Sequence, residues 1–277
     1  MIDSAERIFI KEHAYIPEHL PDYVTAISST EPYLIDNFLV HVRESNLIFV
    51  GYPLCIEGDE IKMMVALDRA QTRFTPNVTS IISPFIPPAI ADCTPSQSDN
   101  YFRLNLANLK IPKKTSNMLR RAQRGVSVQT GEFSREHGNL IKAFLQISKL
   151  DRDTRFVFKR VPEYCKSETA LIYEARNSKG DLVAFDVADF GSKAYAFYMF
   201  NFRSRKFKVP GVSDLLLAHI IEHTQQQGKP YLNLGLGINE GVSFFKTKWG
   251  GKPFLTYTSC EQKSGKQVQW WETLTQL

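Results

Sequence analysis

The sequence predicts an α+β protein in which helices flank a mixed β-sheet, and three observations support this prediction. Of the 277 residues 43% are apolar, which is enough to build one large core or two ordinary ones. The first hundred residues consist mainly of short apolar runs joined by proline-rich or polar connections. From Lys113 onward, stretches with helical periodicity alternate with stretches of alternating apolar and polar residues.

The N-terminal part of the chain, residues 1–105, is predicted to form one β-rich domain. Apolar runs bounded by turn residues predict strands over 46–54, 61–69, 77–86 and 100–106. Between the last two strands, residues 87–100 are rich in proline, serine and aspartate, which indicates an exposed loop. We expect a second domain over residues 106–277.

The second part opens with a short basic helix. Residues 113–125 contain an apolar stripe, with Thr115 or Ser116 as a helix start and Gly125 as a stop. The next residues, 126–133, alternate as a strand does. This stretch therefore predicts a helix followed by a strand.

The remaining elements follow in a regular order. Ser134 can cap an amphipathic helix that extends to residue 151, and residues 161–168 can hold a further helix. The later elements are strands over 169–177, 181–191 and 193–202, a helix over 213–228, a strand over 231–238, a helix over 240–249 and a strand over 254–260. The predicted order from Lys113 is αβαβββαβαβ.

The start of the chain and the lack of a long apolar segment predict a cytoplasmic protein. The first twenty residues lack the features of a secretory signal, and no segment approaches the roughly 20 apolar residues of a membrane span. The four cysteines form no CxxC pair, so they predict free buried thiols rather than a zinc site or a disulfide. His219 and His223 lie four residues apart without a third ligand, so we expect no metal.

The charge of the chain is uneven. Its net charge of +5 is modest, but residues 110–124 carry six lysines and arginines without an acid, and residues 203–208 carry four more. Clusters of one sign favour an anionic partner, such as the phosphates of a cofactor or RNA. The alternative for each cluster is a solvated face.

A candidate ligand site lies where the strand 193–202 leads into the helix that follows. Ser213 or Asp214 can cap that helix, whose first amides carry a partial positive charge. Lys208 and Gly211 precede it, so a cation and a closely approaching backbone can meet a diphosphate there. An ordinary Pro-Gly loop before a capped helix is the alternative.

Residues 237–253 combine glycines with aromatic residues and lysines. Phe244, Phe245 and Trp249 lie at helical spacing and are expected to pin a short helix to the sheet. Glycines at both ends, at 237, 241, 250 and 251, allow sharp turns.

These residues resemble those of a known superfamily. The stretch KFKVPGVSDLLL resembles the acyl-CoA-binding motif of the GNAT N-acyltransferases, a Gln or Arg, two residues, Gly, one residue, then Gly or Ala. Lys208, Gly211 and Ser213 take the three places, so the first and third depart from the common pattern. The resemblance implies a GNAT-like sheet flanked by helices.

Two further stretches resemble the branch that includes the Fem-type aminoacyl transferases. LNLGLGINEGVSFFKTKWGGKP is similar to its C-terminal signature, a strand followed by a Phe-Lys pair and a glycine-bounded turn. LKIPKKTSNMLRRAQRGVSV is similar to the basic helix ahead of its catalytic domain. Since Fem-type proteins contain tandem GNAT-like domains, residues 1–105 can be a degenerate second copy, although no internal repeat is evident.

The resemblance implies roles for individual residues. Lys246, in the pair with Phe245, would stabilise the negative charge that develops on the carbonyl oxygen during acyl transfer. A lysine that snorkels from a buried helix is the alternative. The pantetheine arm of the donor would bind the splayed strand at Met199, Phe200 and Asn201. Its phosphates would bind at Lys208, Gly211, Val212, Ser213 and Asp214.

Acyl transfer to an amine also needs a proton acceptor. Glu174, Asp186 and Asp189 lie on or at the end of the predicted central strands. Asp186 stands between Phe185 and Val187 in an apolar strand, so burial can raise its pKa, and it is the candidate base. A strand with one face in water, however, carries acids routinely.

The sequence thus predicts N-acyl transfer from acyl-CoA or an acyl carrier protein to the amine of a small molecule. A second hypothesis keeps the enzyme but takes aminoacyl-tRNA as donor, with the basic helix 113–124 gripping RNA. A third is a non-catalytic protein that retains the fold as a binding module.

Overall fold

The computed structural model describes residues 1–55, 60–88, 90, 93 and 95–263. Its helices are α1 (Ser4–His13), α2 (Pro21–Ser28), α3 (Glu60–Phe74), α4 (Lys113–Gln123), α5 (Arg135–Ile147), α6 (Arg152–Tyr164), α7 (Val212–Gln226) and α8 (Glu240–Lys248), with 3-10 helices η1 (Pro17–His19) and η2 (Leu106–Asn108). Its strands are β1 (Glu31–Ile35), β2 (Phe38–Arg43), β3 (Asn46–Val50), β4 (Val78–Ser83), β5 (Pro95–Asn105), β6 (Ser127–Gly131), β7 (Ala170–Arg176), β8 (Leu182–Asp189), β9 (Tyr195–Arg203), β10 (Tyr231–Leu236) and β11 (Lys252–Lys263).

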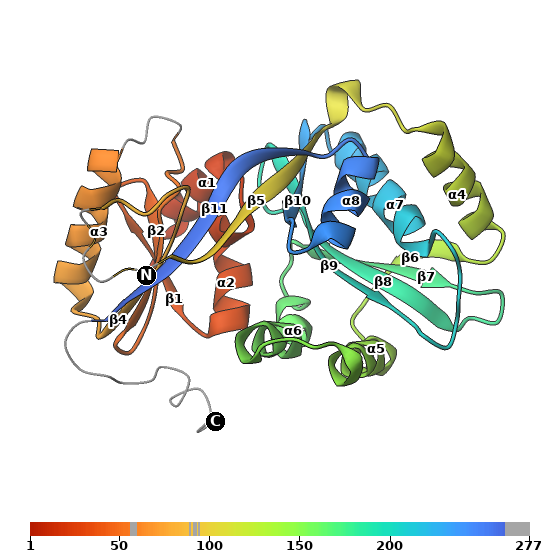
Figure 1. Ribbon diagram of the computed structural model, residues 1–277, viewed down its shortest axis with the longest axis horizontal. Coiled ribbons are helices and arrows are strands. Elements are labelled where there is room, and N and C mark those ends of the chain that lie inside the picture. Colours follow the sequence, from red (N-terminus) through yellow and green to blue (C-terminus); the bar gives the residue numbers. More distant parts are fainter. Residues whose placement is uncertain (56–59, 89, 91–92, 94, 264–277) are drawn as a thin grey trace.

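Within these residues the strands form one mixed sheet, which confirms the predicted class. The sheet has eleven strands in the order β1-β2-β3-β4-β11-β5-β10-β9-β8-β7-β6. Helices flank it along its length, with α5 and α6 on the side away from α7 and α8 (Figure 1). No helix in the described ranges is long and apolar enough to cross a membrane.

The same succession of elements occurs twice along the chain. Strands β1, β2 and β3 pair antiparallel, α3 follows, and β4 returns parallel to β3. Strands β7, β8 and β9 also pair antiparallel, α7 follows, and β10 returns parallel to β9. The chain therefore consists of two tandem halves whose topology repeats, as the resemblance implied.

The two halves exchange a strand at the middle of the sheet. β5 follows β4 in the chain but pairs with β10 of the second half. β11 follows α8 but pairs with β4 of the first half. β5 and β11 also pair with each other, and they run side by side as long strands between the halves (Figure 1).

Strand β8 shows how the second half builds its core. All of its residues are buried, because helices cover both faces of the sheet here. Phe185 and Val187 pack with residues of α5 and α6, whereas Ala184 and Ala188 pack with residues of α7. Asp186 therefore lies on the α7 face of the sheet.

Residues 61–69, predicted as a strand, belong instead to helix α3. Met63, Ala66, Leu67 and Ala70 are buried, and their spacing of three and four residues places them on one face of a helix. The prediction was wrong because it weighed the apolar run and not its period.

Other predicted boundaries shift as well. Helices α1 and α2 were not predicted, and α4 begins directly after Pro112 rather than at Thr115 or Ser116. The helix expected within 161–168 is the end of α6, which starts at Arg152 after the N-cap Asp151. Of the predicted loop 87–100, the part from Pro95 belongs to β5, and positions 89, 91–92 and 94 lie outside the described residues. The predicted strands and helices after residue 112 are otherwise present.

Two of the cysteines contradict the prediction of free thiols. Cys93 and Cys260 form a disulfide, whereas Cys55 and Cys165 are free and half-buried. In the β5–β11 pair Cys260 lies opposite Pro95, so the register brings it beside Cys93, two residues earlier. A sequence separation of 167 residues hides this pairing from sequence analysis.

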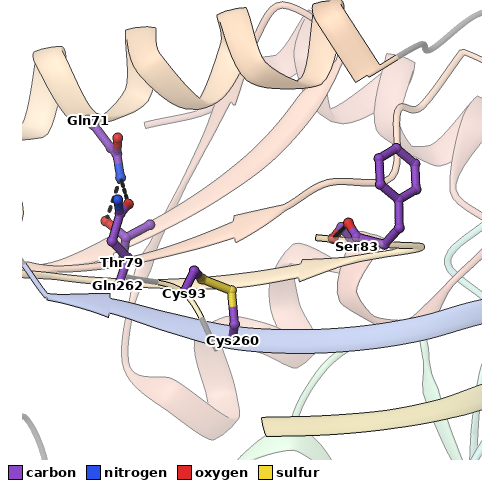
Figure 2. Close-up of a disulfide and its surroundings, with 7 residues drawn as sticks. Gln71, Thr79, Ser83, Cys93, Cys260 and Gln262 are labelled. Carbon is purple, nitrogen blue, oxygen red and sulfur yellow. Dashed lines mark hydrogen bonds between the residues drawn. A yellow bond between two sulfur atoms is a disulfide. The ribbon is translucent and has the colours of Figure 1, made fainter. Parts of the chain in front are cut away.

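Figure 2 shows the disulfide between β11 and the segment ahead of β5. Near it, Gln71 of α3 donates from Nε2 to Thr79 Oγ1 at 3.2 Å and to Gln262 Oε1 at 2.8 Å. The disulfide thus ties β11 to the segment ahead of β5, and these hydrogen bonds link α3 to β4 and β11.

Candidate active site

The parallel strands β9 and β10 separate at their carboxyl ends. They pair only from Tyr195 to Phe197 on β9 and from Tyr231 to Asn233 on β10. Beyond this point β9 continues along β8, and β10 continues along β5. The carboxyl ends of diverging parallel strands are where open α/β sheets bind ligands. We call this opening the splay.

Local irregularities accompany the splay on both strands. On β10 the register shifts between Asn233 and Gly235, and Gly235 has a φ of +74°, which favours glycine. On β9, Tyr198 lies opposite Ala188 and Phe200 opposite Val187, so Met199 is the extra residue of a bulge. The two strands are thus bent apart by features of their own backbones.

Lys246 of α8 lies at the end of β10. Its side chain is 4% exposed, and Nζ donates a hydrogen bond to the carbonyl of Leu236, the last residue of β10. A Cβ added at Gly235 would lie 3.7 Å from this Nζ and 3.9 Å from the carbonyl oxygen of Tyr198 on β9. The ammonium group therefore lies beside the splay rather than in bulk solvent.

Burial lowers the pKa of Lys246 to about 7, and the nearby charge of Asp99 opposes this shift only in part. Asp99 lies on β5 and accepts a hydrogen bond from the Ile238 amide at 2.6 Å. Sequence analysis missed Asp99, because only the strand exchange brings β5 next to β10. At neutral pH, Lys246 is thus close to the point where it changes charge.

Of the three aromatic residues in α8 and at its C-cap, two pack against the protein and one is exposed. Trp249 is buried, and Phe245 stacks on Tyr198 with 6.3 Å between ring centroids. Phe244 is 70% exposed, so the prediction that it pins the helix to the sheet is wrong. Its position next to Phe245 turns it about 100° around the helix axis, away from the core.

The N-terminus of α7 faces the same side of the sheet as Lys246. Its N-cap is Gly211, at φ +82°, and not Ser213 or Asp214 as predicted. The Ser213 hydroxyl donates to Asn201 instead, at 3.2 Å, and no side chain caps the helix. A Cβ at Gly211 would lie 2.8 Å from the Met118 carbonyl oxygen, so this glycine lets α4 approach closely.

The three other residues predicted for phosphate binding differ in environment. Asp214 Oδ1 accepts from Trp249 Nε1 at 2.9 Å and pairs with Lys248 Nζ at 2.6 Å, so its carboxylate faces α8. The Val212 amide donates to the Val209 carbonyl at 3.3 Å. Lys208 is exposed at the mouth of the helix.

Asp186 of β8 lies next to Asn201, the residue that accepts from Ser213. It is fully buried, and its Oδ1 accepts from Asn201 Nδ2. Burial raises the pKa of Asp186 to about 8, although hydrogen bonds from Asn201 and Tyr198 and the charge of Arg203 oppose the shift. Ser213, Asn201 and Asp186 thus form one chain of hydrogen bonds from α7 to β8.

The other residues of the predicted strand site and the other acids lie elsewhere. The Phe200 side chain is buried in the α5 and α6 core, and Met199 packs against the same core. Asp189 accepts from Tyr164 and Thr169 hydroxyls at 2.7 and 2.8 Å. Glu174 pairs with Arg176 and His137, at 2.6 and 3.1 Å, near the outer strand β6.

The two basic clusters of the sequence come together at α7. Helix α4 packs against α7, and Gly125 after its end lies next to Val209, which directly follows the second cluster. The cations of both clusters are exposed, and they are Lys110, Lys113, Lys114, Arg120, Arg121, Arg124, Arg203, Arg205, Lys206 and Lys208. We call them the basic rim.

A separate hollow of about 420 Å³ lies between β6 and the second half of α7. His219, Glu222 and His223 line it together with Tyr173, whose hydroxyl bonds to His223 Nδ1 at 2.5 Å. Across the described ranges, no three His, Cys, Asp or Glu side chains are grouped to hold a metal ion.

Comparisons with known proteins give the fold a name. No family model and no curated protein matches the chain. Among solved structures, the C-terminal domain of a putative lysylphosphatidylglycerol synthetase from Agrobacterium fabrum is 14% identical, with a TM-score of 0.60 over 93% of this chain and 92% of that one. FemX is 10% identical, with a TM-score of 0.60 over 93% of this chain and 96% of that one.

A tandem GNAT protein from the clavulanic acid biosynthesis pathway is also similar. It is 12% identical, with a TM-score of 0.53 over 83% of this chain and 79% of that chain. Identities this low establish the shared fold and not a shared activity. The chain therefore has a GNAT-like α+β fold built from two tandem halves, a fold that it shares with FemX and with a tandem GNAT protein.

Proposed function

We propose that the protein is an N-acyltransferase that moves an acyl group from a thioester donor to the amine of a small molecule. The observation that carries the proposal is the buried Lys246 ammonium beside the splay of β9 and β10. The donor is acyl-CoA or an acylated carrier protein, whose pantetheine arm enters the splay along the β9 backbone at Met199, Phe200 and Asn201. The residues proposed for catalysis and donor binding all lie within the proposed second domain, 106–277, and Asp99 of residues 1–105 lies near Lys246.

The reaction forms one bond and breaks one. The amine attacks the thioester carbonyl, a C–N bond forms, and the C–S bond breaks as the thiol leaves with a proton. Lys246, when protonated, stabilises the negative oxygen of the tetrahedral intermediate. Phe245 stacks on Tyr198 and so positions this tyrosine of β9. The basic rim and the start of α7 hold the phosphates of the donor, through the amides of Gly211, Ser213 and Asp214, whereas the Val212 amide donates to the Val209 carbonyl.

Asp186 is the proposed proton acceptor for the attacking amine. Its carboxyl is charged only at pH values above its pKa of about 8. Lys246 is protonated only below its pKa of about 7. The active form therefore needs a deprotonated Asp186 together with a protonated Lys246, and between their two pKa values each group is mostly in the other state. We expect a bell-shaped rate profile whose maximum lies midway between these two values. A rate that rises steadily from pH 6 to pH 9 would contradict the role of Lys246, and a rate that falls steadily over the same range would contradict the role of Asp186.

The first experiment compares donors on the purified full chain. Coenzyme A and a set of acyl-CoAs are expected to raise the unfolding temperature saturably, and mass spectrometry is expected to detect an acylated amine after incubation with an amine library. If neither donor binding nor product appears with CoA or carrier-protein thioesters, the thioester proposal fails.

The joined basic rim favours one further candidate, a transferase that uses aminoacyl-tRNA. Ten exposed cations on two neighbouring segments can contact several phosphates of an RNA stem. Binding of tRNA whose affinity falls by about 10³-fold or more between 50 and 200 mM salt, with transfer of its aminoacyl group, would establish this donor. Binding of a donor without transfer would instead leave a non-catalytic binding protein.

A further inference from the structure

Asp99 lies on β5 at the point where β10 ends. The two strands pair as far as Leu236, and the Gly237 amide then donates to the Asn100 carbonyl at 3.1 Å. Asp99 is the next residue of β5, so its carboxylate meets the turn that leads from β10 into α8. This turn consists of residues 237–239, and we call it the α8 turn.

The carboxylate of Asp99 fits closely against the α8 turn. Its Oδ2 accepts a hydrogen bond from the Ile238 amide at 2.6 Å, and a Cβ added at Gly237 would lie 2.7 Å from its Oδ1. Glycine at 237 therefore leaves room for the carboxylate. The Asn239 amide donates to the Gly237 carbonyl at 2.6 Å, and Asn239 is the N-cap of α8. The turn thus joins Asp99 to the start of the helix that carries Lys246.

Ile238 has a backbone conformation that its residue type rarely adopts. Its φ is +59°, in the left-handed region, where a β-branched side chain is crowded by its own backbone. The side chain is 72% exposed, so packing in the core does not hold it there. A strained residue persists only where its surroundings fix it. The hydrogen bond from the Ile238 amide to Asp99 is a contact that does so.

The same turn adjoins the ammonium group of Lys246. Nζ donates to the carbonyl of Leu236, the residue directly before the turn. Rotation of the backbone after Leu236 would therefore move this carbonyl and the ammonium group bonded to it. The charge of Asp99 also raises the pKa of Lys246 against the larger lowering by burial, so it favours the protonated form. Asp99 thus acts on Lys246 through the backbone and through its charge.

Other charged side chains on the elements around Lys246 bond to different partners or lie in solvent. Those with partners are Asp186, Asp214, Lys248 and Arg103, and those in solvent are Glu240 and Lys252. None of the ion pairs within the described ranges includes Asp99. Its carboxylate is therefore free of a competing cation and can support the charge of Lys246.

We propose that Asp99 is a positioning residue for the reaction at the splay: its carboxylate holds the α8 turn and keeps the protonated side chain of Lys246 beside Leu236. Asp99 belongs to residues 1–105, so the first part of the chain contributes to the site. This inference rests on the proposed function for its effect on turnover. Its effect on Lys246 is measurable without any reaction.

The first test titrates Lys246 directly in the full chain without substrate. Protein with isotope-labelled lysine is followed by NMR between pH 5 and pH 10, and Lys246→Arg identifies the signal. We expect this signal to titrate near pH 7 in the wild type and at a lower pH in Asp99→Asn. The asparagine keeps the shape and an oxygen for the Ile238 amide but removes the charge.

Asp68→Asn is the matched control for this titration. It makes the same change at an exposed aspartate of α3 and is expected to leave the Lys246 signal unchanged. If Asp99→Asn also titrates as the wild type does, Asp99 does not support the charge of Lys246, and the proposal is overturned.

The second test measures the α8 turn itself. Asp99→Ala removes the acceptor of the Ile238 amide, so we expect hydrogen exchange at this amide to become at least about tenfold faster. Asp99→Asn is expected to remain close to the wild type, because an oxygen still accepts from the amide. Equal exchange in Asp99→Ala and in the wild type would mean that the turn keeps its shape without Asp99, which contradicts the proposal.

The third test follows turnover. Asp99→Asn is expected to lower kcat several-fold with little change in the KM of the donor. The maximum of its rate profile is expected to move to lower pH, because it lies midway between the pKa values of Lys246 and Asp186. Asp99→Glu keeps the charge and is expected to return the maximum toward the wild-type pH. A purely structural role would lower the unfolding temperature without moving this maximum.

The combined results separate this inference from the proposed function. If the Lys246 titration moves in Asp99→Asn while no acyl transfer is found, the proposed function fails and the link between Asp99 and Lys246 stands. If transfer occurs while Asp99→Asn keeps both the wild-type titration and the wild-type rate profile, the positioning role is refuted and the function stands.

Discussion

The two halves contain the same junction of parallel strands, closed in one and open in the other. In the first half β3 and β4 pair along five positions, from Asn46–Val78 to Val50–Ile82, and the Gly51 amide continues the ladder to Ile82. In the second half β9 and β10 pair along three positions and then separate. Topology therefore provides two equivalent places for a ligand, and local backbone irregularity makes only one of them available.

Packing also closes the first junction. A Cβ at Gly51 would lie 2.8 Å from Ser83 Cβ and 2.9 Å from Met63 Sδ, so α3 and β4 fill the space above the strand end. At the second junction a Cβ at Gly235 meets nothing closer than 3.7 Å. The junction in the first half is thus filled by side chains, and the junction in the second half offers the candidate site.

The largest expected effect follows the removal of the buried cation. Lys246→Ala is expected to lower kcat by about 10²–10³-fold with little change in donor affinity, because the developing oxyanion loses its stabilising charge. Steady-state kinetics and calorimetry with coenzyme A measure the two quantities. Lys252→Ala, which removes an exposed lysine of β11, is the matched control. An unchanged kcat would remove the catalytic role of Lys246.

The second prediction concerns the disulfide in the first half. Cys93→Ser, or reduction of the wild type, is expected to lower the free energy of unfolding by about 2–4 kcal/mol, because the bond closes a long loop. Chemical denaturation measures this loss, and reductant should not destabilise Cys93→Ser further. Turnover should change little, since Cys260 pairs with β4 and β5 away from the splay. A parallel loss of kcat would show that the activity at the splay depends on the disulfide in the first half.

The third prediction tests whether the first junction is packed shut. Gly51→Ala is expected to destabilise the protein by about 1–3 kcal/mol through overpacking against Ser83 and Met63. Gly138→Ala in α5 is the control with the opposite sign, because its Cβ would meet open space and alanine favours a helix. Equal stability of wild type and Gly51→Ala would mean that the first junction has room for a ligand.

The smallest expected effect comes from single charges of the basic rim. Lys208→Ala is expected to weaken coenzyme A binding by up to about fivefold at low salt, and the difference should fade as salt screens the exposed charge. Titrations at two salt concentrations measure this, with the distant Lys179→Ala as control. A loss that does not depend on salt would place Lys208 in a buried contact instead.

Sequence analysis predicted the second half well because its signals are local. The helical period of α5, the alternation along β7 and β8 and the lysine at 246 can all be read within short windows. The motif around Gly211 also identified the correct helix, although Gly211 itself is the N-cap. Cap residues were misassigned because a serine near a helix start can bond to a neighbouring strand instead.

What the sequence could not predict depends on pairing between distant strands. Asp99 lies near Lys246, and Cys260 lies beside Cys93, only because β5 and β11 are exchanged between halves. Nothing within either segment encodes its partner. Helix α3 is different, since Met63, Ala66 and Ala70 carried a readable helical period that the interpretation as a strand overlooked.

The strand exchange also governs how the chain can be made and taken apart. β11 is the last strand of the described residues, yet it fills the gap between β4 and β5, so both keep open edges until it has been synthesised. Final assembly of the sheet must therefore follow translation of nearly all the described residues. For the same reason a single cut of the chain between the halves would not separate the two fragments, because β5 would still pair with β10 and β11 would still pair with β4.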